Sequence, residues 1–352
     1  MVKDFNVHVE VCLKPHSNIR FEQVQLYVEK YIRDTTTVLF PHSAINDFAG
    51  SSVLLEHVDM IRICEANEAT HIDCIRTETA TLNIHVYQLS ESEGIDEYDS
   101  ASEEQVDVAT SHHLTLPAHS LEGLWENLIF EENIKSRLLE YVYTAMLFSD
   151  KAVNSHIISW NRVALLHGPP GTGKTSLCKA LAQKLAIRLN QRYSHGKLVE
   201  INSHSLFSKW YSESGKLVMK LFGQIMDIVE DDNAFVCVLI DEVESLTSAR
   251  KAALAGTEPS DAIRVVNALL TQIDKLKSRP NVLILATSNI TQAIDLAFID
   301  RADIKQYIGL PRHKAVYSIL ASCLDELVRV GIITETTDAS KTSYLVQLLT
   351  CV

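Results

Sequence analysis

A glycine-rich stretch, residues 165–176, carries the residue types that bind a nucleotide phosphate. It fits the pattern G-x-x-x-x-G-K-[ST], in which glycines let the backbone curl and bring its N–H groups close to phosphate oxygens. The ammonium of Lys174 can reach the β- and γ-phosphates of ATP, and the hydroxyl of Thr175 can ligate Mg²⁺. We therefore predict a phosphate-binding loop formed by Gly168, Pro169, Pro170, Gly171, Thr172, Gly173, Lys174, Thr175 and Ser176.

Two adjacent carboxylates, Asp241 and Glu242, follow a continuous apolar run at residues 236–240. Such a run is typical of a strand buried on both faces of a parallel sheet, and open sheets of this kind bind ligands at their carboxyl edge. Asp241 would hold Mg²⁺, directly or through a water molecule. Glu242 would orient and deprotonate the attacking water. The pair therefore predicts metal-assisted hydrolysis beside the phosphate loop.

Two polar residues further along the chain complete the predicted site. Asn289 ends the next apolar run, residues 282–287, where its amide can position the attacking water against the γ-phosphate. Arg301 lies just downstream, and an arginine at this place in an ATPase domain commonly points into the neighbouring subunit's site. The alternative for Arg301 is a surface ion pair with Asp300 or Asp303.

The elements that position these residues are predicted from the apolar pattern. Three runs, at residues 163–166, 236–240 and 282–287, indicate buried parallel strands. The helix that opens at Lys174 carries leucines at helical spacing, and its N-terminal end favours a bound anion. We expect an α/β fold with a parallel sheet over residues 121–310.

A small α+β domain is predicted ahead of this sheet, over residues 1–90. In residues 5–13 apolar side chains alternate with His8, Glu10 and Cys12, which indicates a half-buried strand. The remaining patterns predict a helix and two more strands, over residues 19–32, 58–63 and 82–89. Nothing in this segment points to catalysis, so we expect a substrate- or adaptor-binding domain.

The segment between the two domains is strongly acidic. Residues 91–107 contain eight Asp or Glu and no Lys or Arg, a composition that cannot bury a core. We therefore predict an acidic flexible linker over residues 91–120. At the other end, residues 311–352 predict one helix, around 316–330, and thus a partial helical lid.

The overall composition excludes several classes of protein. The formal charge of −13 argues against a nonspecific nucleic-acid binder, so no direct nucleic-acid partner is expected. The seven cysteines form no C-x-x-C pair and are expected to be free thiols in a reducing compartment. No apolar run approaches the roughly 20 residues of a membrane span, and no signal peptide is evident, so we expect no membrane partner.

These motifs, in this order, resemble the AAA+ ATPase module: phosphate loop, acid pair, strand-end Asn289 and Arg301. Longer segments closely resemble the pachytene checkpoint protein 2 family of AAA+ ATPases, also called thyroid receptor-interacting ATPases. These segments are Val7–Arg20, Ile201–Lys216, Gly256–Arg264 and Asp300–Gly309.

The resemblance implies a homohexameric ring that binds ATP and Mg²⁺ and remodels HORMA-domain proteins, often with a HORMA-type adaptor. It further implies roles in meiotic recombination, chromosome-axis control and silencing of the spindle checkpoint, and a location in the nucleus, on chromosomes, and in the cytoplasm. By position, Trp210 and Tyr211 fall on the first pore loop that grips substrate, and residues 248–256 lie near a second.

The carboxyl-terminal end leaves an alternative open. Members of this family continue into a helical lid with a Gly-Leu-Ser-Gly-Arg motif, which is absent from this sequence. We therefore expect an incomplete lid and a shortened chain. The rival hypothesis is a non-hydrolysing nucleotide-binding adaptor or dominant-negative isoform. A nucleic-acid motor of the same superfamily is a third, disfavoured by the acidic charge.

Overall fold

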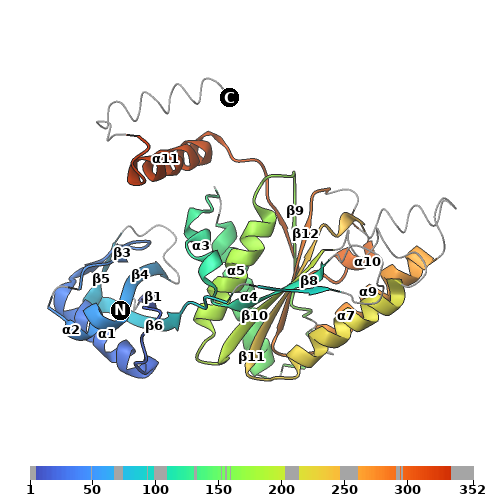
Figure 1. Ribbon diagram of the computed structural model, residues 1–352, viewed down its shortest axis with the longest axis horizontal. Coiled ribbons are helices and arrows are strands. Elements are labelled where there is room, and N and C mark those ends of the chain that lie inside the picture. The colour runs from blue at the N-terminus through green and yellow to red at the C-terminus, as the bar shows by residue number, and fades with distance from the viewer. Residues whose placement is uncertain are drawn as a thin grey trace.

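The chain forms two sheet-based domains that lie side by side, and a last helix beside the larger one (Figure 1). The computed structural model describes residues 5–48, 50–66, 74–92, 94–98, 109–130, 133–151, 153–154, 157–158, 160–202, 214–245, 261–290, 294 and 296–333. Statements about structure below concern these residues.

The N-terminal domain is a four-stranded mixed sheet covered by one long helix. Its elements are β1 (Phe5–Leu13), α1 (Phe21–Thr35), β2 (Val38–Leu39), β3 (Ala44–Ile45), α2 (Ser52–His57), β4 (Val58–Ala66), β5 (Ile75–Arg76), η1 (Thr77–Thr79) and β6 (Ala80–Gln88). The sheet order is β3-β4-β1-β6, in which β1 is antiparallel to β4 and parallel to β6. Valines of β1 and α1 pack together in its core. The α+β character therefore matches the prediction.

The larger domain is built on a seven-stranded sheet. Its elements are β7 (Ile95–Tyr98), β8 (Ala109–Leu116), η2 (His119–Leu121), α3 (Leu124–Asn127), α4 (Ile134–Asp150), β9 (Val163–His167), α5 (Lys174–Arg188), β10 (His195–Asn202), α7 (Ser214–Val229), β11 (Ala234–Asp241), α9 (Asp261–Leu276), β12 (Val282–Ser288), α10 (Leu296–Ile299) and β13 (Ile304–Tyr307). Helix α11 (His313–Arg329) follows. The strand order is β13-β9-β12-β11-β10-β8-β7, and the first five are mutually parallel.

Helices cover both faces of this sheet, which explains the unbroken apolar strands. Side chains at alternate positions of β9 are buried in different cores. Val163 and Leu165 pack with α7 and α9, whereas Ala164 and Leu166 pack with α4 and α5. Since both sets of side chains are buried, the strands show no apolar–polar alternation. The predicted parallel α/β sheet is thus confirmed.

The predicted acidic linker over residues 91–120 is wrong in two places. Residues 109–116 form β8, which pairs antiparallel with β10, and residues 95–98 form β7, which pairs with β8. The sheet therefore begins upstream of residue 121. The sequence hid this because Leu114 and Leu116 are the only large apolar residues in β8, next to an acidic segment.

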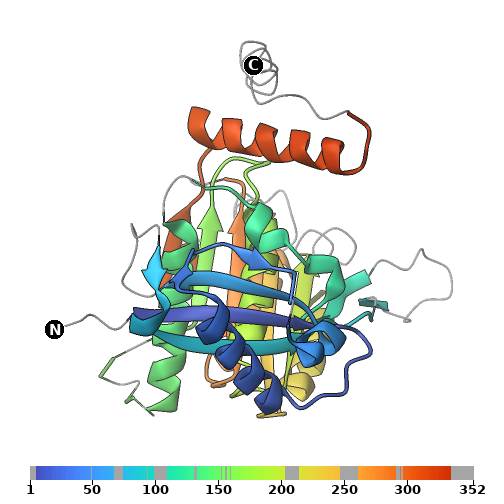
Figure 2. The ribbon, with the colours of Figure 1, turned by 90° about the vertical axis from the view of Figure 1, so that its left-hand side faces the viewer.

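Strand β1 is buried on both faces, not on one. Val7, Val9 and Val11 fill the N-terminal core, and the alternate residues His8 and Glu10 are only 8% and 2% exposed. They face the larger domain, where Figure 2 shows the small sheet lying across its front. The alternating pattern correctly gave the strand, but its polar face packs against another domain.

Charged side chains hold this domain interface together. The carboxylate of Glu10 accepts from Lys184 Nζ at 2.7 Å and from Arg188 Nε at 3.1 Å, both on α5. Arg188 also pairs with Glu65 at 2.6 Å. Burial by itself would raise the pKa of Glu10, but the two cations outweigh burial and hold that pKa below its usual value. Helix α5 is therefore tied to the N-terminal domain by a buried, mutually compensating charge cluster.

We predict that Glu10→Gln lowers the free energy of unfolding by about 3–5 kcal/mol, because it removes the buried carboxylate shared by two buried cations. Their other partners, Glu65 for Arg188 and Glu126 for Lys184, are 26% and 32% exposed. Urea denaturation followed by circular dichroism measures this.

The matched control is Glu29→Gln, since Glu29 pairs with Arg33 at 3.0 Å while both side chains are 42% exposed. That variant should lose less than about 1 kcal/mol. Equal losses of unfolding free energy in the two variants would contradict the conclusion that Glu10 stabilises the domain interface through a buried charge cluster.

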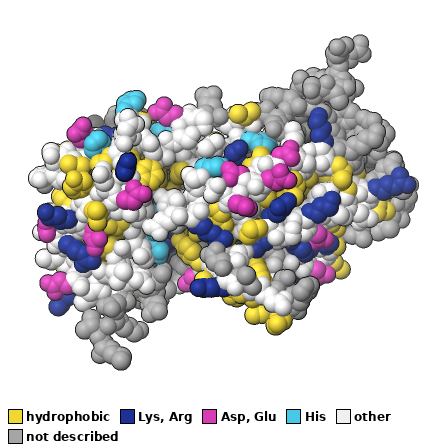
Figure 3. All heavy atoms as spheres, turned by 90° about the horizontal axis from the view of Figure 1, so that it is seen from below, with side chains coloured by type: hydrophobic (Ala, Val, Ile, Leu, Met, Phe, Trp, Pro, Cys, Tyr) yellow, Lys and Arg dark blue, Asp and Glu magenta, His cyan; other side chains and the backbone are white. Residues whose placement is uncertain are grey.

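None of the helices in the described ranges has the length and apolar character needed to cross a membrane. On the face seen in Figure 3, basic and acidic side chains are interspersed. The described residues on that face therefore form no broad basic surface of the kind that tracks a phosphate backbone.

Candidate active site

The phosphate loop connects β9 to α5 and has the backbone that its glycines predict. Gly171 and Gly173 have φ values of 74° and 82°, in the left-handed region that favours glycine. Gly168, with φ 148°, approaches the neighbouring strand so closely that a Cβ there would lie 2.0 Å from the carbonyl oxygen of Ile308. The loop therefore depends on glycine at these positions.

Lys174 is held at the start of α5, over the loop. Its Nζ donates to the carbonyl oxygen of Pro169 at 2.7 Å, and Thr172 Oγ1 donates to the same oxygen at 2.9 Å. Burial lowers the pKa of Lys174, an effect that Glu244 and Asp241 oppose. The ammonium thus lies between the carbonyl oxygen of Pro169 and the acids at the carboxyl end of β11, where a phosphate would be bound.

The acid pair lies at the carboxyl end of β11, next to the loop. Thr175 Oγ1 donates to Asp241 Oδ1 at 2.9 Å, which brings the two predicted metal-binding oxygens together. A hydroxyl and a carboxylate oxygen suit Mg²⁺, a hard cation that prefers oxygen ligands. These two residues fit the ion that the sequence predicts.

Glu242 and Asn289 meet across the ends of β11 and β12. The side-chain amide of Asn289 donates through Nδ2 to Glu242 Oε1 at 3.4 Å, and the backbone amide of Asn289 donates to Glu244 Oε1 at 3.1 Å. The backbone of Glu242 has φ 57°, an uncommon conformation for a residue with a Cβ. The proposed base and the proposed water-positioning amide are therefore neighbours.

Thr287 joins the site without having been predicted. Its hydroxyl donates to Asp241 Oδ1 and accepts from the Glu242 amide at 3.2 Å. A signal was present in the sequence, because Thr287 lies near the end of β12, two positions before the predicted site residue Asn289. A threonine in an apolar run is nevertheless common, so the pattern alone did not single it out.

Arg301 lies at the opposite end of the sheet from the phosphate loop. It precedes β13, whose residues Ile304 and Tyr307 pair with Ala164 and His167, so Arg301 is at the amino end of β9. Its guanidinium binds Asp274 through Nε at 2.9 Å and Nη2 at 2.8 Å. The alternative of an ion pair with Asp300 or Asp303 therefore named the wrong acids. The observed partner, Asp274, is on α9, and nothing in the sequence spacing pointed to it.

Asp303, one of those two acids, supports the start of β9. Its carboxylate accepts from the backbone amides of Asn161 and Arg162, at 2.6 and 2.9 Å, and from the hydroxyl of Tyr141 at 3.0 Å. It is therefore occupied in holding the strand that leads into the phosphate loop.

A cavity of about 600 Å³ adjoins the loop at Gly171 and Gly173. Apolar side chains from the segment before α4 and from α11 line it, among them Leu128, Ile134 and Ile319. Its position and apolar lining suit the base and sugar of a nucleotide whose phosphates lie in the loop. Trp125, the aromatic residue of α3, does not line this cavity. Its ring lies instead near Lys135, whose Nζ is 5.3 Å from the ring centroid.

Trp210 and Tyr211 are the predicted residues of the first pore loop. Both lie outside the described residues, as does the predicted second pore loop at 248–256.

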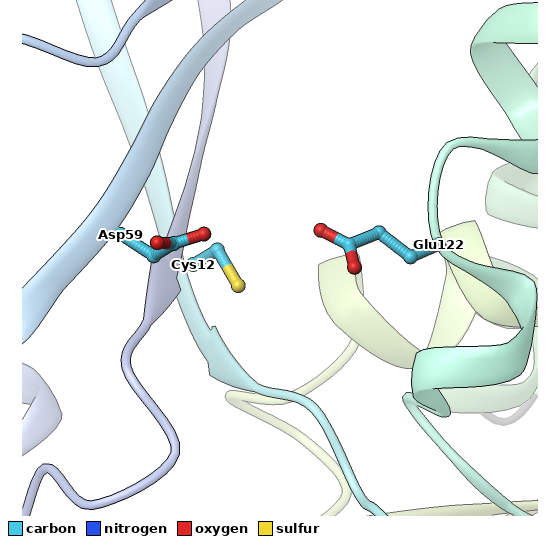
Figure 4. Close-up of side chains that lie close together, drawn as sticks. All are labelled: Cys12, Asp59 and Glu122. Atoms are coloured by element: carbon cyan, nitrogen blue, oxygen red, sulfur yellow. The ribbon is translucent and has the colours of Figure 1, made fainter. Parts of the chain in front are cut away.

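The described cysteines are free, and one of them lies beside two carboxylates. Figure 4 shows Cys12 and Asp59 of the N-terminal domain facing Glu122 of the larger one, with their ligand atoms within 4.8 Å of one another. Burial, followed by the charge of Glu122, raises the pKa of the Cys12 thiol to about 12. A thiol with that pKa is protonated at neutral pH, whereas metals bind the thiolate, so we assign no metal here.

Comparisons with known proteins agree with this geometry. Residues 164–310 match the ATPase family associated with various cellular activities (AAA), residues 3–92 match the TRIP13 N-terminal domain, and residues 312–351 match the TRIP13-like, AAA+ ATPase lid C-terminal domain. The pachytene checkpoint protein 2 homolog of Arabidopsis thaliana is 54% identical over 330 residues, which are 94% of this chain and 70% of the relative.

Solved structures give the same result. The C. elegans PCH-2 structure is 40% identical, with a TM-score of 0.75, covering 95% of this chain and 81% of that one. A chain from an E. coli MS115-1 HORMA:CdnC:Trip13 complex shares the fold at 19% identity and a TM-score of 0.53, covering 66% of this chain and 78% of that one. With its phosphate loop, acid pair and matching N-terminal domain, the chain is an ATPase that belongs to the pachytene checkpoint protein 2 family.

Proposed function

We propose that this ATPase remodels HORMA-domain proteins, as a homohexameric ring that pulls a substrate segment into its central pore. The observation that carries the proposal is the combination of a TRIP13-type N-terminal domain with a nucleotide site equipped for hydrolysis. The bacterial Trip13 chain of similar fold was solved together with a HORMA protein, which supports the same substrate class.

Within the site, each side chain has a separate task. Lys174 and the loop amides bind the phosphates, and Thr175 and Asp241 would hold Mg²⁺, which would supply charge neutralisation at the phosphoryl group. Glu242 takes a proton from the attacking water, while Asn289 orients that water. Arg301 stabilises the transition-state charge of the adjoining subunit's site.

Substrate handling belongs to the rest of the ring. The N-terminal domain recruits the HORMA protein, directly or through a HORMA-type adaptor. Trp210 and Tyr211 grip the substrate segment at the pore, because aromatic side chains make large apolar contacts that do not require a particular sequence. By this proposal the protein acts in meiotic chromosome-axis control and in silencing the spindle checkpoint, in the nucleus and cytoplasm.

The test is amide hydrogen exchange of a purified HORMA-domain protein mixed with this chain, Mg²⁺ and ATP. We expect exchange in the HORMA protein to rise only while ATP is hydrolysed, since pulling on a segment opens local structure. Lys174→Ala is the control, because it removes the phosphate-binding ammonium. Hydrolysis without any change in the HORMA protein would leave the ATPase intact and overturn the substrate assignment.

A further inference from the structure

The hydroxyl of Thr287 lies between the two acids to which the site assigns different roles. Thr287 is on β12, the strand between β9 and β11, and is 1% exposed. Its Oγ1 donates to Asp241 Oδ1 and accepts from the backbone amide of Glu242 at 3.2 Å. One hydroxyl therefore uses both its donor and an acceptor lone pair on two adjacent residues, the last of β11 and the one that follows it.

The backbone of Thr287 adds a further restraint. Its carbonyl oxygen accepts from the amide of Val243 at 3.0 Å. Thr287 thus binds the backbone amides of Glu242 and Val243 and the carboxylate of Asp241. Glu242, in the middle of these three residues, has φ 57°. A residue with a Cβ persists in that conformation only where its surroundings impose it. Thr287 supplies that restraint at the point where β11 turns away from the sheet.

The hydroxyl of Thr287 also has a different relation to Asp241 from that of Thr175. Both hydroxyls donate to the same oxygen, Oδ1 of Asp241. By the proposed function, the hydroxyl of Thr175 would serve as a ligand of Mg²⁺. The hydroxyl of Thr287 has no such second task, and it can keep Oδ1 oriented throughout the cycle.

We propose that Thr287 is a positioning residue for ATP hydrolysis, which fixes the carboxylate of Asp241 and the backbone of Glu242 in their separate orientations. This inference rests on the proposed roles of Asp241 as metal holder and Glu242 as base. By this proposal Thr287 acts through the two acids, to which its hydroxyl is hydrogen-bonded.

The test compares variants that separate the hydroxyl from the shape of the side chain. Thr287→Val keeps the shape and removes the hydroxyl, whereas Thr287→Ser keeps the hydroxyl and removes the methyl group. We expect Thr287→Val to lower kcat by about 10- to 100-fold. It should also raise the Mg²⁺ concentration needed for half-maximal binding of a non-hydrolysable fluorescent ATP analogue, measured without turnover, as losses of a metal ligand's hydrogen-bond partner do. The KM for ATP should change by less than about threefold, because the phosphate loop is untouched. Thr287→Ser should stay within about threefold of the parent chain in kcat.

Two outcomes would overturn the proposal: a Thr287→Val chain with a kcat within about twofold of the parent, or a Thr287→Ser chain as impaired as Thr287→Val. The second outcome would assign the effect to packing. If Val is not tolerated at this buried place, Thr287→Ser against Thr287→Ala gives the same comparison with small side chains. Glu242→Gln is measured in parallel: retained turnover there refutes the assigned base, whereas lost turnover there with an active Thr287→Val chain refutes only this inference.

Discussion

Replacing Arg301 with Ala is expected to lower ATP turnover by about 10³- to 10⁵-fold, the range known for arginines that complete a phosphoryl-transfer site from a neighbouring subunit. The geometry of a single chain gives the reason. Arg301 is at the amino end of the sheet, and its own phosphate loop is at the carboxyl end. Its side chain is 24% exposed, so it can contact an adjoining subunit. Steady-state turnover at several protein concentrations measures the effect.

A mixing experiment separates this role from a structural one. Lys174→Ala chains have a dead site but an intact Arg301, and Arg301→Ala chains have the reverse. Mixing two inactive variants should therefore restore turnover wherever an Arg301 reaches an intact neighbouring loop. Asp274→Ala is the matched control, since Asp274 binds Arg301 through two hydrogen bonds in the same chain. If Asp274→Ala were as inactive as Arg301→Ala and mixing restored nothing, the ion pair would be structural.

The local motifs of the site could be predicted from the sequence because they are short and follow the chain. The phosphate loop needs a strand, a few glycines and a helix in order, and residues 163–188 contain them all. The acid pair and Asn289 each end a strand, and parallel strands bring their carboxyl ends to one edge. Periodicity and chain order thus suffice to place these side chains near one another.

The contacts between distant elements could not be predicted in the same way. The polar face of β1 was expected to meet water, but Glu10 instead meets Lys184 and Arg188, more than 170 positions away. His8 likewise contacts His85 at 3.0 Å. A buried charge has the same sequence pattern as an exposed one, and only the partner distinguishes them.

The missed strands β7 and β8 follow from the same physics. Acidic, serine-containing segments usually lack the apolar side chains that order a chain. Here the order comes from backbone pairing of β8 with the edge of β10, together with the burial of Leu114 and Leu116. The sequence of such a strand needs little apolar character when the rest of the sheet already exists.

Replacing Glu242 with Gln is expected to leave ATP binding intact and to lower turnover by about 10²- to 10⁴-fold, the usual contribution of a general base. Gln keeps the length of the side chain and an oxygen toward Asn289 Nδ2, which lies 3.4 Å from the carboxylate oxygen. It removes the ability to take a proton. Binding of a fluorescent ATP analogue and single-turnover hydrolysis measure the two steps separately.

The matched control is Glu244→Gln, at a second acid two residues further along. Glu244 Oε1 accepts from the backbone amide of Asn289 at 3.1 Å, a bond that the oxygen of Gln can also accept. We therefore expect Glu244→Gln to lose less than about tenfold in turnover, because it alters support for Asn289 and leaves the base in place. If Glu242→Gln hydrolysed ATP at the parent rate, Glu242 would not be the base. Greater loss in Glu244→Gln than in Glu242→Gln would move that role to Glu244, since both carboxylates accept from Asn289, Glu242 from its side-chain amide and Glu244 from its backbone amide.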